Sequence, residues 1–199
     1  LADQIHSTNV FVVGEKDRGR GALEFESNIG EGDALCTATK GLPIGVLVAD
    51  CAAVLCYDPA VPAIGIAHSG WRGTAQAIAP ALISTMNREY GCREERMFIW
   101  MAPCIGACCY EVGEEVIAEF KKLQPELVHS TEWRQPKLHT PGKWFLDLRK
   151  VILQQLLDCG VPESQIEISP DCTCCNPGYF SYRRTGKGTG HMMAVIAMK

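Results

Sequence analysis

The stretch VADCAAVLCYDPAVPAIGIAHSGWRG, residues 48–73, decides the fold class of this chain. It contains two short apolar runs, residues 53–57 and 63–68, which predict β-strands. The residues DPAVP between them are typical of a turn. A cysteine and a histidine lie at the ends of these strand-like segments, and small and basic residues follow directly.

The apolar period changes after Gly73. Ile78, Leu82 and Met86 recur four residues apart, which predicts a helix over residues 74–90 that ends near Gly91. Similar reasoning predicts further strands at 44–48, 97–102, 165–169 and 194–198, and helices around 116–123 and 148–156. The polar stretch 124–143 shows no period and indicates a long excursion. We therefore expect one α/β (α+β) domain over residues 1–199 with mixed β-sheets.

Composition excludes several classes of protein. The chain has 199 residues, 47% of them hydrophobic and 21% charged, and a net charge of −4 without a basic tract. Nucleic acid and an anionic membrane are therefore not expected as partners. The first residues lack the basic and apolar regions of a signal peptide, so we expect a cytoplasmic protein.

Eleven cysteines are many for such a chain. The odd number and the crowded motifs ACCY and CTCC fit no disulfide framework, so we expect reduced thiols. The CTCC motif, residues 172–175, has the spacing of half a zinc knuckle, but no second CxxC pair completes it. We interpret this motif as structural, with metal or redox chemistry as the alternative.

The candidate site begins with Cys51 and His68. Each alone is consistent with a buried core residue, but adjacent strands would place the two strand ends side by side. Asp50 could then hold a ligand histidine by its second ring nitrogen, or it could be a turn residue. His6 is the obvious third ligand, because one cysteine and two histidines with an open position are typical of catalytic zinc.

Other residues compete for these roles or extend the site. His129, His139 and His191 are alternative ligands that composition does not exclude. The turn GWRG places Arg72 between glycines before the predicted helix, which favours anion or substrate binding. The pair Arg183 and Arg184 is more typical of a surface than of a site.

Four blocks carry a resemblance to a known family: ADCAAVLCYDP, IGIAHSGWRGTAQAI, APCIGACCYEVGEEV and CTCCNPGYFSYRR. In this order they resemble the YfiH/YlmD-type proteins, which are also labelled laccase-domain or multicopper polyphenol oxidase proteins. The resemblance covers essentially the whole chain. It implies a four-layer α/β/β/α domain, similar to a cytotoxic deamidase, and one zinc held by His6, Cys51 and His68.

The resemblance also implies an activity. Family members phosphorolyse adenosine, inosine, guanosine and methylthioadenosine to base and ribose 1-phosphate, and they deaminate adenosine; these are transferase and hydrolase reactions. The chain departs from the family pattern in three places. The segment that normally precedes the QxH block is not among these residues, HAGW is HSGW, and the usual TGR is TGH, which places His191 where an arginine is common.

Three functions follow as hypotheses. The leading one is a zinc-dependent purine nucleoside phosphorylase with adenosine deaminase activity, in which Cys51, His68, Asp50 and Arg72 carry catalysis. The second is a Cu²⁺-dependent polyphenol oxidase, although five histidines and no His-x-His pair argue against a multicopper site. The third is a metal-free hydrolase or deamidase with Cys51 as nucleophile and His68 as base. A non-enzymatic binding role stays open.

Overall fold

The computed structural model describes residues 1–124, 133–134 and 142–199. The strands are β1 (Val10–Val12), β2 (Ala34–Thr37), β3 (Ile44–Val48), β4 (Ala52–Asp58), β5 (Ala63–Ser69), β6 (Phe98–Met101), β7 (Glu111–Gly113), β8 (Trp133–Arg134), β9 (Lys143–Leu146), β10 (Ile166–Ile168) and β11 (Met192–Ile196). The α-helices are α1 (Trp71–Ala75), α2 (Ile78–Tyr90), α3 (Glu114–Leu123), α4 (Leu148–Asp158) and α5 (Tyr182–Thr185).

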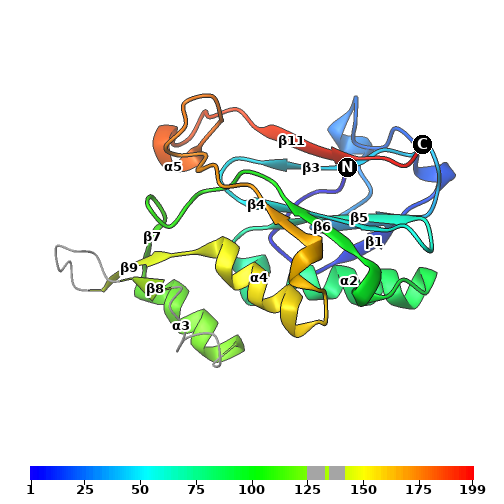
Figure 1. Ribbon diagram of the computed structural model, residues 1–199. Helices are drawn as coiled ribbons and strands as arrows, with labels where there is room; N and C mark the ends of the chain where they lie inside the picture. The colour runs from blue at the N-terminus through cyan, green and yellow to red at the C-terminus, as the bar shows by residue number, and fades with distance from the viewer. Residues whose placement is uncertain (125–132, 135–141) are drawn as a thin grey trace.

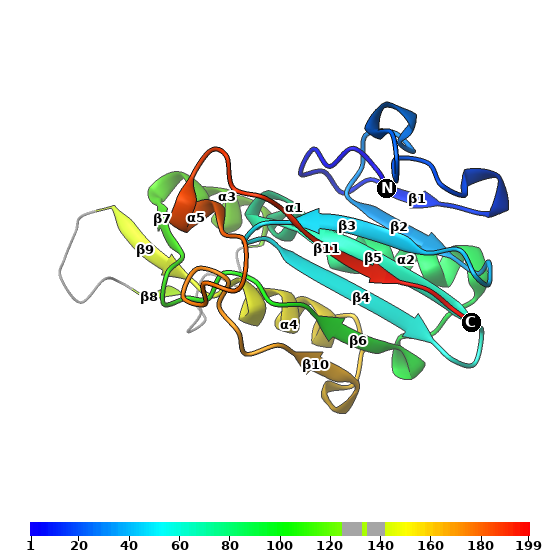
Figure 2. The ribbon, with the colours of Figure 1, turned by 90° about the horizontal axis from the view of Figure 1, so that it is seen from above.

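The centre of the molecule is a six-stranded mixed sheet in the order β1-β2-β5-β4-β6-β10. The two outer pairs, β1–β2 and β6–β10, are parallel, and the inner pairs are antiparallel. Helices α2 and α4 cover one face of this sheet, and the antiparallel pair β3–β11 covers the other (Figure 1). The view from above shows β3 and β11 lying over the middle of the sheet (Figure 2). The predicted mixed α/β domain is confirmed, and the fourth layer of the expected α/β/β/α arrangement stays a prediction.

Strands β4 and β5 are apolar over most of their length and are buried on both faces. Side chains of β4 alternate between the two cores: Val54 packs toward the helices, and Leu55 packs toward β3 and β11. On β5, Ile64 and Ile66 belong to the β3–β11 side. A two-sided core explains why the sequence shows continuous apolar runs instead of strict alternation.

Gly65 lets helix α2 approach β5 closely. A Cβ atom at this position would lie 2.6 Å from Sδ of Met86 and 2.9 Å from Cδ1 of Leu82. These two residues belong to the apolar face that predicted the helix. The contact fixes α2 beneath the strand that carries His68.

The predicted helix over residues 74–90 is wrong at its N-terminal end. The structure has two helices there, α1 and α2, separated at Gln76 and Ala77, and Ala77 has a left-handed backbone with φ of 62°. The carbonyl groups freed by the break are satisfied by buried amides: Gln124 donates to Thr74 and Ala75, and Gln155 donates to Thr74. The periodic residues Ile78, Leu82 and Met86 all lie in α2, so their spacing gives no information about the break before it.

The remaining predicted elements agree with the structure to within a few residues. Helices α3 and α4 span Glu114–Leu123 and Leu148–Asp158, close to the expected ranges 116–123 and 148–156. Strands β1, β2, β7 and β9 were not anticipated, because they are short or mixed in polarity. Most of the polar excursion 124–143 lies outside the described residues, as do His129 and His139, although β8 within it pairs with β9. None of the helices in the described ranges is long and apolar enough to cross a membrane.

Candidate active site

Strands β4 and β5 bring Cys51 and His68 together. The strands are antiparallel neighbours, with Ala52 opposite Ser69 and Ala53 opposite His68. Cys51 directly precedes β4, so its side chain lies at the end of the sheet where β5 finishes. The expectation that adjacent strands would place the two residues side by side is confirmed.

His6 reaches the same place from the N-terminal segment. One side-chain ligand atom from each of His6, Cys51 and His68 lies within 4.8 Å of the other two. The rings of His6 and His68 have their centroids 4.9 Å apart. His6 has a positive φ of 62°, which is uncommon for a residue with a side chain, so its surroundings must hold it there.

The buried carboxylate of Asp33 holds both histidine segments. Its oxygens accept hydrogen bonds from the backbone N–H groups of Ile5, His6 and Ser7 and from the hydroxyl of Ser7. Oδ1 also lies 2.8 Å from Nδ1 of His68. A proton on Nδ1 leaves Nε2 of His68 as the ring nitrogen available to a ligand.

Asp33 and the two histidines influence one another's pKa. Burial works against ionised Asp33, but the hydrogen bonds from His68 and Ser7 outweigh it and lower its pKa to about 2. Burial also opposes a protonated His68, but Asp33 and Cys51 together raise its pKa to about 9. Burial and the nearby His68 lower the pKa of His6.

The expectation that Asp50 would orient a ligand histidine is wrong. Its carboxylate accepts hydrogen bonds from the hydroxyls of Thr173 and Ser181, at 2.6 and 3.1 Å, and from the backbone N–H of Arg183, at 2.6 Å. Asp50 has φ of 88°, so the alternative of a turn residue describes its backbone. Its side chain anchors the segment around α5, and Asp33 makes the contact with a histidine ring that was expected of Asp50.

The three side chains fit a metal ion. Gly70 faces the space between them: a Cβ atom there would lie 2.9 Å from both Sγ of Cys51 and Nδ1 of His6. The glycine has an ordinary φ of −77°, so its small size, and not backbone strain, is what this position uses. One thiolate and two imidazoles form a donor set that suits Zn²⁺ or copper.

A cavity of about 500 Å³ opens over these three residues. This volume lies within the usual range for small-molecule sites. Its walls include the aromatic side chains of Phe25, Trp71, Tyr110 and Tyr182 and the basic side chains of Arg72, Arg183 and His191. Aromatic faces suit a flat heterocycle, and cationic side chains suit an anion.

Three arginines were singled out in the sequence: Arg72 is exposed beside Trp71, whereas Arg183 and Arg184 are exposed and donate hydrogen bonds to loop carbonyls. Arg72 is exposed and stacks on Trp71, with its guanidinium carbon 4.2 Å from the ring centroid. Arg183 is exposed, as expected of a surface residue, but it also lines the cavity and donates to the carbonyls of Cys109 and Glu111. The helix after Gly70 has only five residues, so the expected long-helix N-terminus is missing, and the exposed guanidinium of Arg72 is the group at this turn that suits an anion.

Sequence reasoning missed Asp33 and Gly70. Asp33 carries a usable signal, because it is an acidic residue directly before the buried strand β2, as Asp50 and Cys51 are before β4. Gly70 follows His68 by two residues, but its closeness to His6 depends on the fold of the N-terminal segment.

Comparison with known proteins shows the family of this chain. The family model described as multi-copper polyphenol oxidoreductase laccase matches residues 1–199. The purine nucleoside phosphorylase YlmD of Geobacillus stearothermophilus is 34% identical over 199 residues, which cover 99% of this chain and 71% of the relative. A protein named adenosine deaminase, from an unknown prokaryotic organism, is 36% identical over 197 residues, 98% of this chain and 73% of its own length.

Solved structures show the same fold. The hypothetical protein YfiH of Bacillus licheniformis superposes with a TM-score of 0.92 and 35% identity, over 100% of this chain and 73% of that one. The crystal structure of YlmD from Geobacillus stearothermophilus gives a TM-score of 0.91 and 34% identity, over 98% and 72% of the two chains.

Proposed function

This chain belongs to the multi-copper polyphenol oxidoreductase laccase family, and we propose that it is a zinc-dependent purine nucleoside phosphorylase that also deaminates adenosine. The proposal rests on one observation above all: His6, Cys51 and His68 meet beneath a cavity with aromatic and basic walls. Relatives that carry the names of both activities support it.

His6, Cys51 and His68 would hold the zinc, with Asp33 fixing the orientation of His68. When bound, zinc supplies Lewis-acid chemistry and activates water. The chain's own contribution begins with Gly70, which keeps the space between the three ligands clear. The buried Asp33 carboxylate keeps the His6 segment in its uncommon backbone conformation.

The walls of the cavity would bind the two parts of a nucleoside and a phosphate. Trp71, Tyr110 and Tyr182 offer faces for a purine ring. In phosphorolysis a phosphate oxygen forms a bond to the anomeric carbon of ribose, and the base leaves with the electron pair of the glycosidic bond. The phosphate must be held against the sugar while this happens, and the exposed guanidinium of Arg72 is the group we assign to it.

Deamination of adenosine is a hydrolysis at the other end of the substrate. Water adds to the purine carbon that carries the amine, and ammonia leaves. This reaction needs no phosphate.

A second candidate uses the same residues without a metal. Cys51, His68 and Asp33 form a series of a thiol, an imidazole and a carboxylate, which is the arrangement of a cysteine nucleophile with its base and orienting acid. His6 separates the two hypotheses, because a thiol–imidazole pair does not need it. The family label suggests a third, copper oxidase chemistry, but a multicopper site needs more histidines than the five in this chain provide.

The experiment is a product analysis with and without a chelator. The purified chain, loaded with Zn²⁺, is incubated with adenosine and phosphate, and adenine, ribose 1-phosphate and inosine are quantified. We expect the products of both reactions, formed at rates that a chelator lowers and added Zn²⁺ restores. Turnover that resists complete removal of metal would favour the cysteine nucleophile, and phenol oxidation with Cu²⁺ in place of nucleoside turnover would favour the oxidase.

A further inference from the structure

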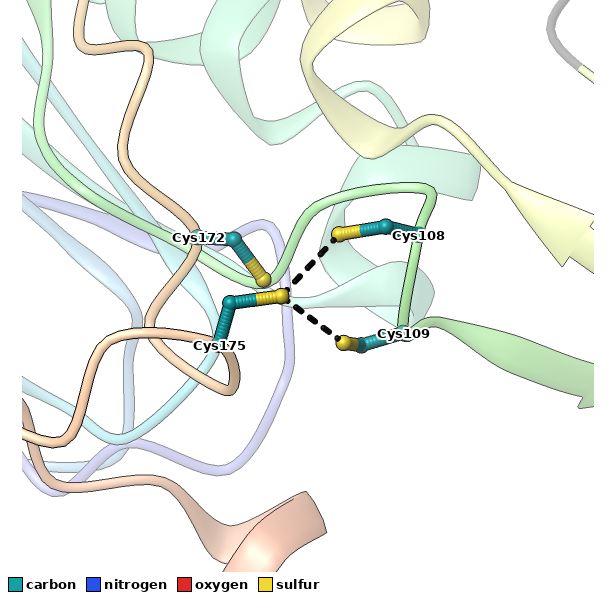
Figure 3. Close-up of side chains that lie close together, drawn as sticks. All are labelled: Cys108, Cys109, Cys172 and Cys175. Carbon is teal, nitrogen blue, oxygen red and sulfur yellow. Dashed lines mark hydrogen bonds between the residues drawn. The ribbon is translucent and has the colours of Figure 1, made fainter.

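Four cysteines outside the candidate active site lie together at one point. Cys108 and Cys109 come from the loop before β7, and Cys172 and Cys175 come from the loop before α5 (Figure 3). All four sulfur atoms lie within 4.8 Å of one another. Cys175 Sγ is 3.4 Å from Sγ of Cys108 and 3.3 Å from Sγ of Cys109.

These distances match a tetrahedron of thiolates around a single ion. Zinc–sulfur bonds of about 2.3 Å place the ligand sulfurs of a tetrahedral site about 3.8 Å apart. An iron–sulfur cluster contains several metal atoms and bridging sulfides, and therefore needs its cysteines farther apart. A disulfide would join Cys175 to only one of two equally close partners and leave the other thiols unused.

The backbone around the cluster is built to bring the sulfurs together. The N–H of Gly106 donates to Sγ of Cys172 at 3.1 Å, a contact that suits a thiolate. A Cβ atom at Gly106 would lie 3.2 Å from both Sγ of Cys108 and Cβ of Cys172, and 2.8 Å from the guanidinium of Arg149. Only glycine fits between the two loops without displacing their cysteines.

Hydrogen bonds also join the two loops independently of sulfur. Thr173 donates its backbone N–H to the carbonyl of Cys104 at 3.1 Å. From α5, Arg183 donates to the carbonyl of Cys109 at 3.1 Å, and Arg184 donates to the carbonyls of Thr173 and Cys174 at 2.8 and 2.9 Å. The four sulfurs are therefore held by a fixed frame and not by a chance approach of two long loops.

We propose that Cys108, Cys109, Cys172 and Cys175 bind one Zn²⁺ in a closed tetrahedral site. The CTCC motif supplies one CxxC half, and the adjacent pair in ACCY supplies the other half. All four positions are filled by protein ligands, so the site is structural. It is separate from the site of His6, Cys51 and His68.

The position of this zinc gives it a role next to the cavity. Ile105 and Tyr110 flank the first cysteine pair in sequence, and Tyr182 and Arg183 follow the second; all four residues line the cavity. Joining the two loops through one ion would fix this wall. Loss of the ion is expected to weaken substrate binding while leaving the zinc at His6, Cys51 and His68 in place.

The test counts the metal ions bound to the chain of residues 1–199. The reduced protein is loaded with Zn²⁺, desalted and analysed by elemental mass spectrometry. We expect two zinc ions per chain in the unmodified protein and one zinc ion per chain in Cys175→Ser. Cys109→Ser removes a ligand from the opposite loop and should also keep one zinc ion. Cys174→Ser is the matched control from the same CTCC motif, and it should keep both ions.

A second readout uses Co²⁺, whose thiolate charge-transfer absorption grows with the number of cysteine ligands. It should fall strongly in Cys175→Ser and only slightly in His6→Ala, which loses the other ion. Two results would overturn the proposal: a single zinc in the unmodified chain that disappears in His6→Ala, or equal loss of zinc in Cys174→Ser and Cys175→Ser. Circular dichroism confirms that each variant is folded. These counts do not depend on nucleoside turnover, so they stand apart from the proposed activity.

Discussion

Oδ1 of Asp33 lies 2.8 Å from Nδ1 of His68, and the same atom accepts the backbone N–H of His6 at 3.0 Å. One buried oxygen thus connects the two histidines of the candidate metal site, which lie far apart in sequence. The strand pairing of β2 with β5 creates this contact, since Asp33 directly precedes β2 and His68 lies near the end of β5. The orientation of the site is therefore encoded in the sheet.

Asp33→Asn is expected to weaken zinc binding at His6, Cys51 and His68 by about 10- to 100-fold, because an amide orients the imidazole less well than a carboxylate. Competition with a chromogenic chelator measures the affinity. Asp50→Asn is the matched comparison, since Asp50 also precedes a strand but holds Thr173, Ser181 and Arg183. That variant should retain the ion and lose substrate affinity. Equal zinc affinities in the two variants would contradict the assigned roles.

Gly70→Ala is expected to exclude the ion while preserving the fold. The new methyl group would lie 2.9 Å from Sγ of Cys51 and from Nδ1 of His6, closer than the side chains can accept without moving apart. Zinc content should fall by one ion per chain, with little change in the melting temperature of the metal-free protein. Gly14→Ala, where the nearest atom is 3.8 Å away, is the control and should keep full zinc content. Normal zinc content in Gly70→Ala would show that this glycine does not border the ion.

Arg72→Ala is expected to raise the KM for phosphate by about 10-fold or more, which corresponds to losing a hydrogen bond to a charged group. Adenosine deamination in the absence of phosphate should change far less, because Arg72 is assigned to the phosphate. Steady-state kinetics with phosphate as the varied substrate measures the effect. Equal losses in both reactions would mean that Arg72 binds the nucleoside itself.

The buried carboxylate of Asp58 is expected to make the stability of the fold depend on pH. Its carboxylate is 0% exposed and accepts hydrogen bonds from the N–H groups of Ala60, Val61 and Arg93 and from the side chain of Arg96. Burial opposes ionisation, but these hydrogen bonds outweigh it, so the pKa of Asp58 in the folded protein lies below its ordinary value of 3.8. The ionised Asp58 therefore stabilises the folded protein fully above the pKa that this carboxyl has in the unfolded chain. This stabilisation is lost as the pH falls through the lower pKa that Asp58 has in the folded protein.

Asp58→Asn should lower the free energy of unfolding by about 2 kcal/mol at neutral pH. The difference between the variant and the unmodified protein should shrink below about pH 4, where the native carboxylate loses its advantage. Urea unfolding at several pH values measures both quantities. A difference that stays constant down to about pH 2 would show that the charge of Asp58 is not what stabilises this turn.

The central strands could be predicted from the sequence because they are buried on both faces. Residues 53–57 and 63–68 carry uninterrupted apolar runs, and their antiparallel pairing placed Cys51 beside His68 as expected. The break between α1 and α2 was not predictable, because the amides that satisfy its carbonyls come from Gln124 and Gln155, far along the chain.

The closeness of His6, Cys51 and His68 was predicted from the sequence, whereas the contribution of Asp33 and Gly70 was missed. Cysteine and histidine indicate their chemistry by residue type, but an aspartate does so only through its neighbours in space. Asp33 and Asp50 precede β2 and β4, and both of these strands pair with β5. Only the hydrogen bonds of the folded chain therefore show that Asp33, and not Asp50, reaches His68. The CTCC motif was likewise incomplete in sequence, since its partner pair is adjacent instead of spaced as CxxC, and the two loops are far apart along the chain.

The most direct test of the account compares the unmodified chain with His6→Ala in one assay of zinc content and adenosine turnover with phosphate. We predict that His6→Ala loses one zinc ion per chain and, with it, release of both adenine and inosine, because a zinc site needs this imidazole and a cysteine nucleophile does not. Full turnover by a folded His6→Ala protein would contradict the central claim that His6, Cys51 and His68 act together around one ion.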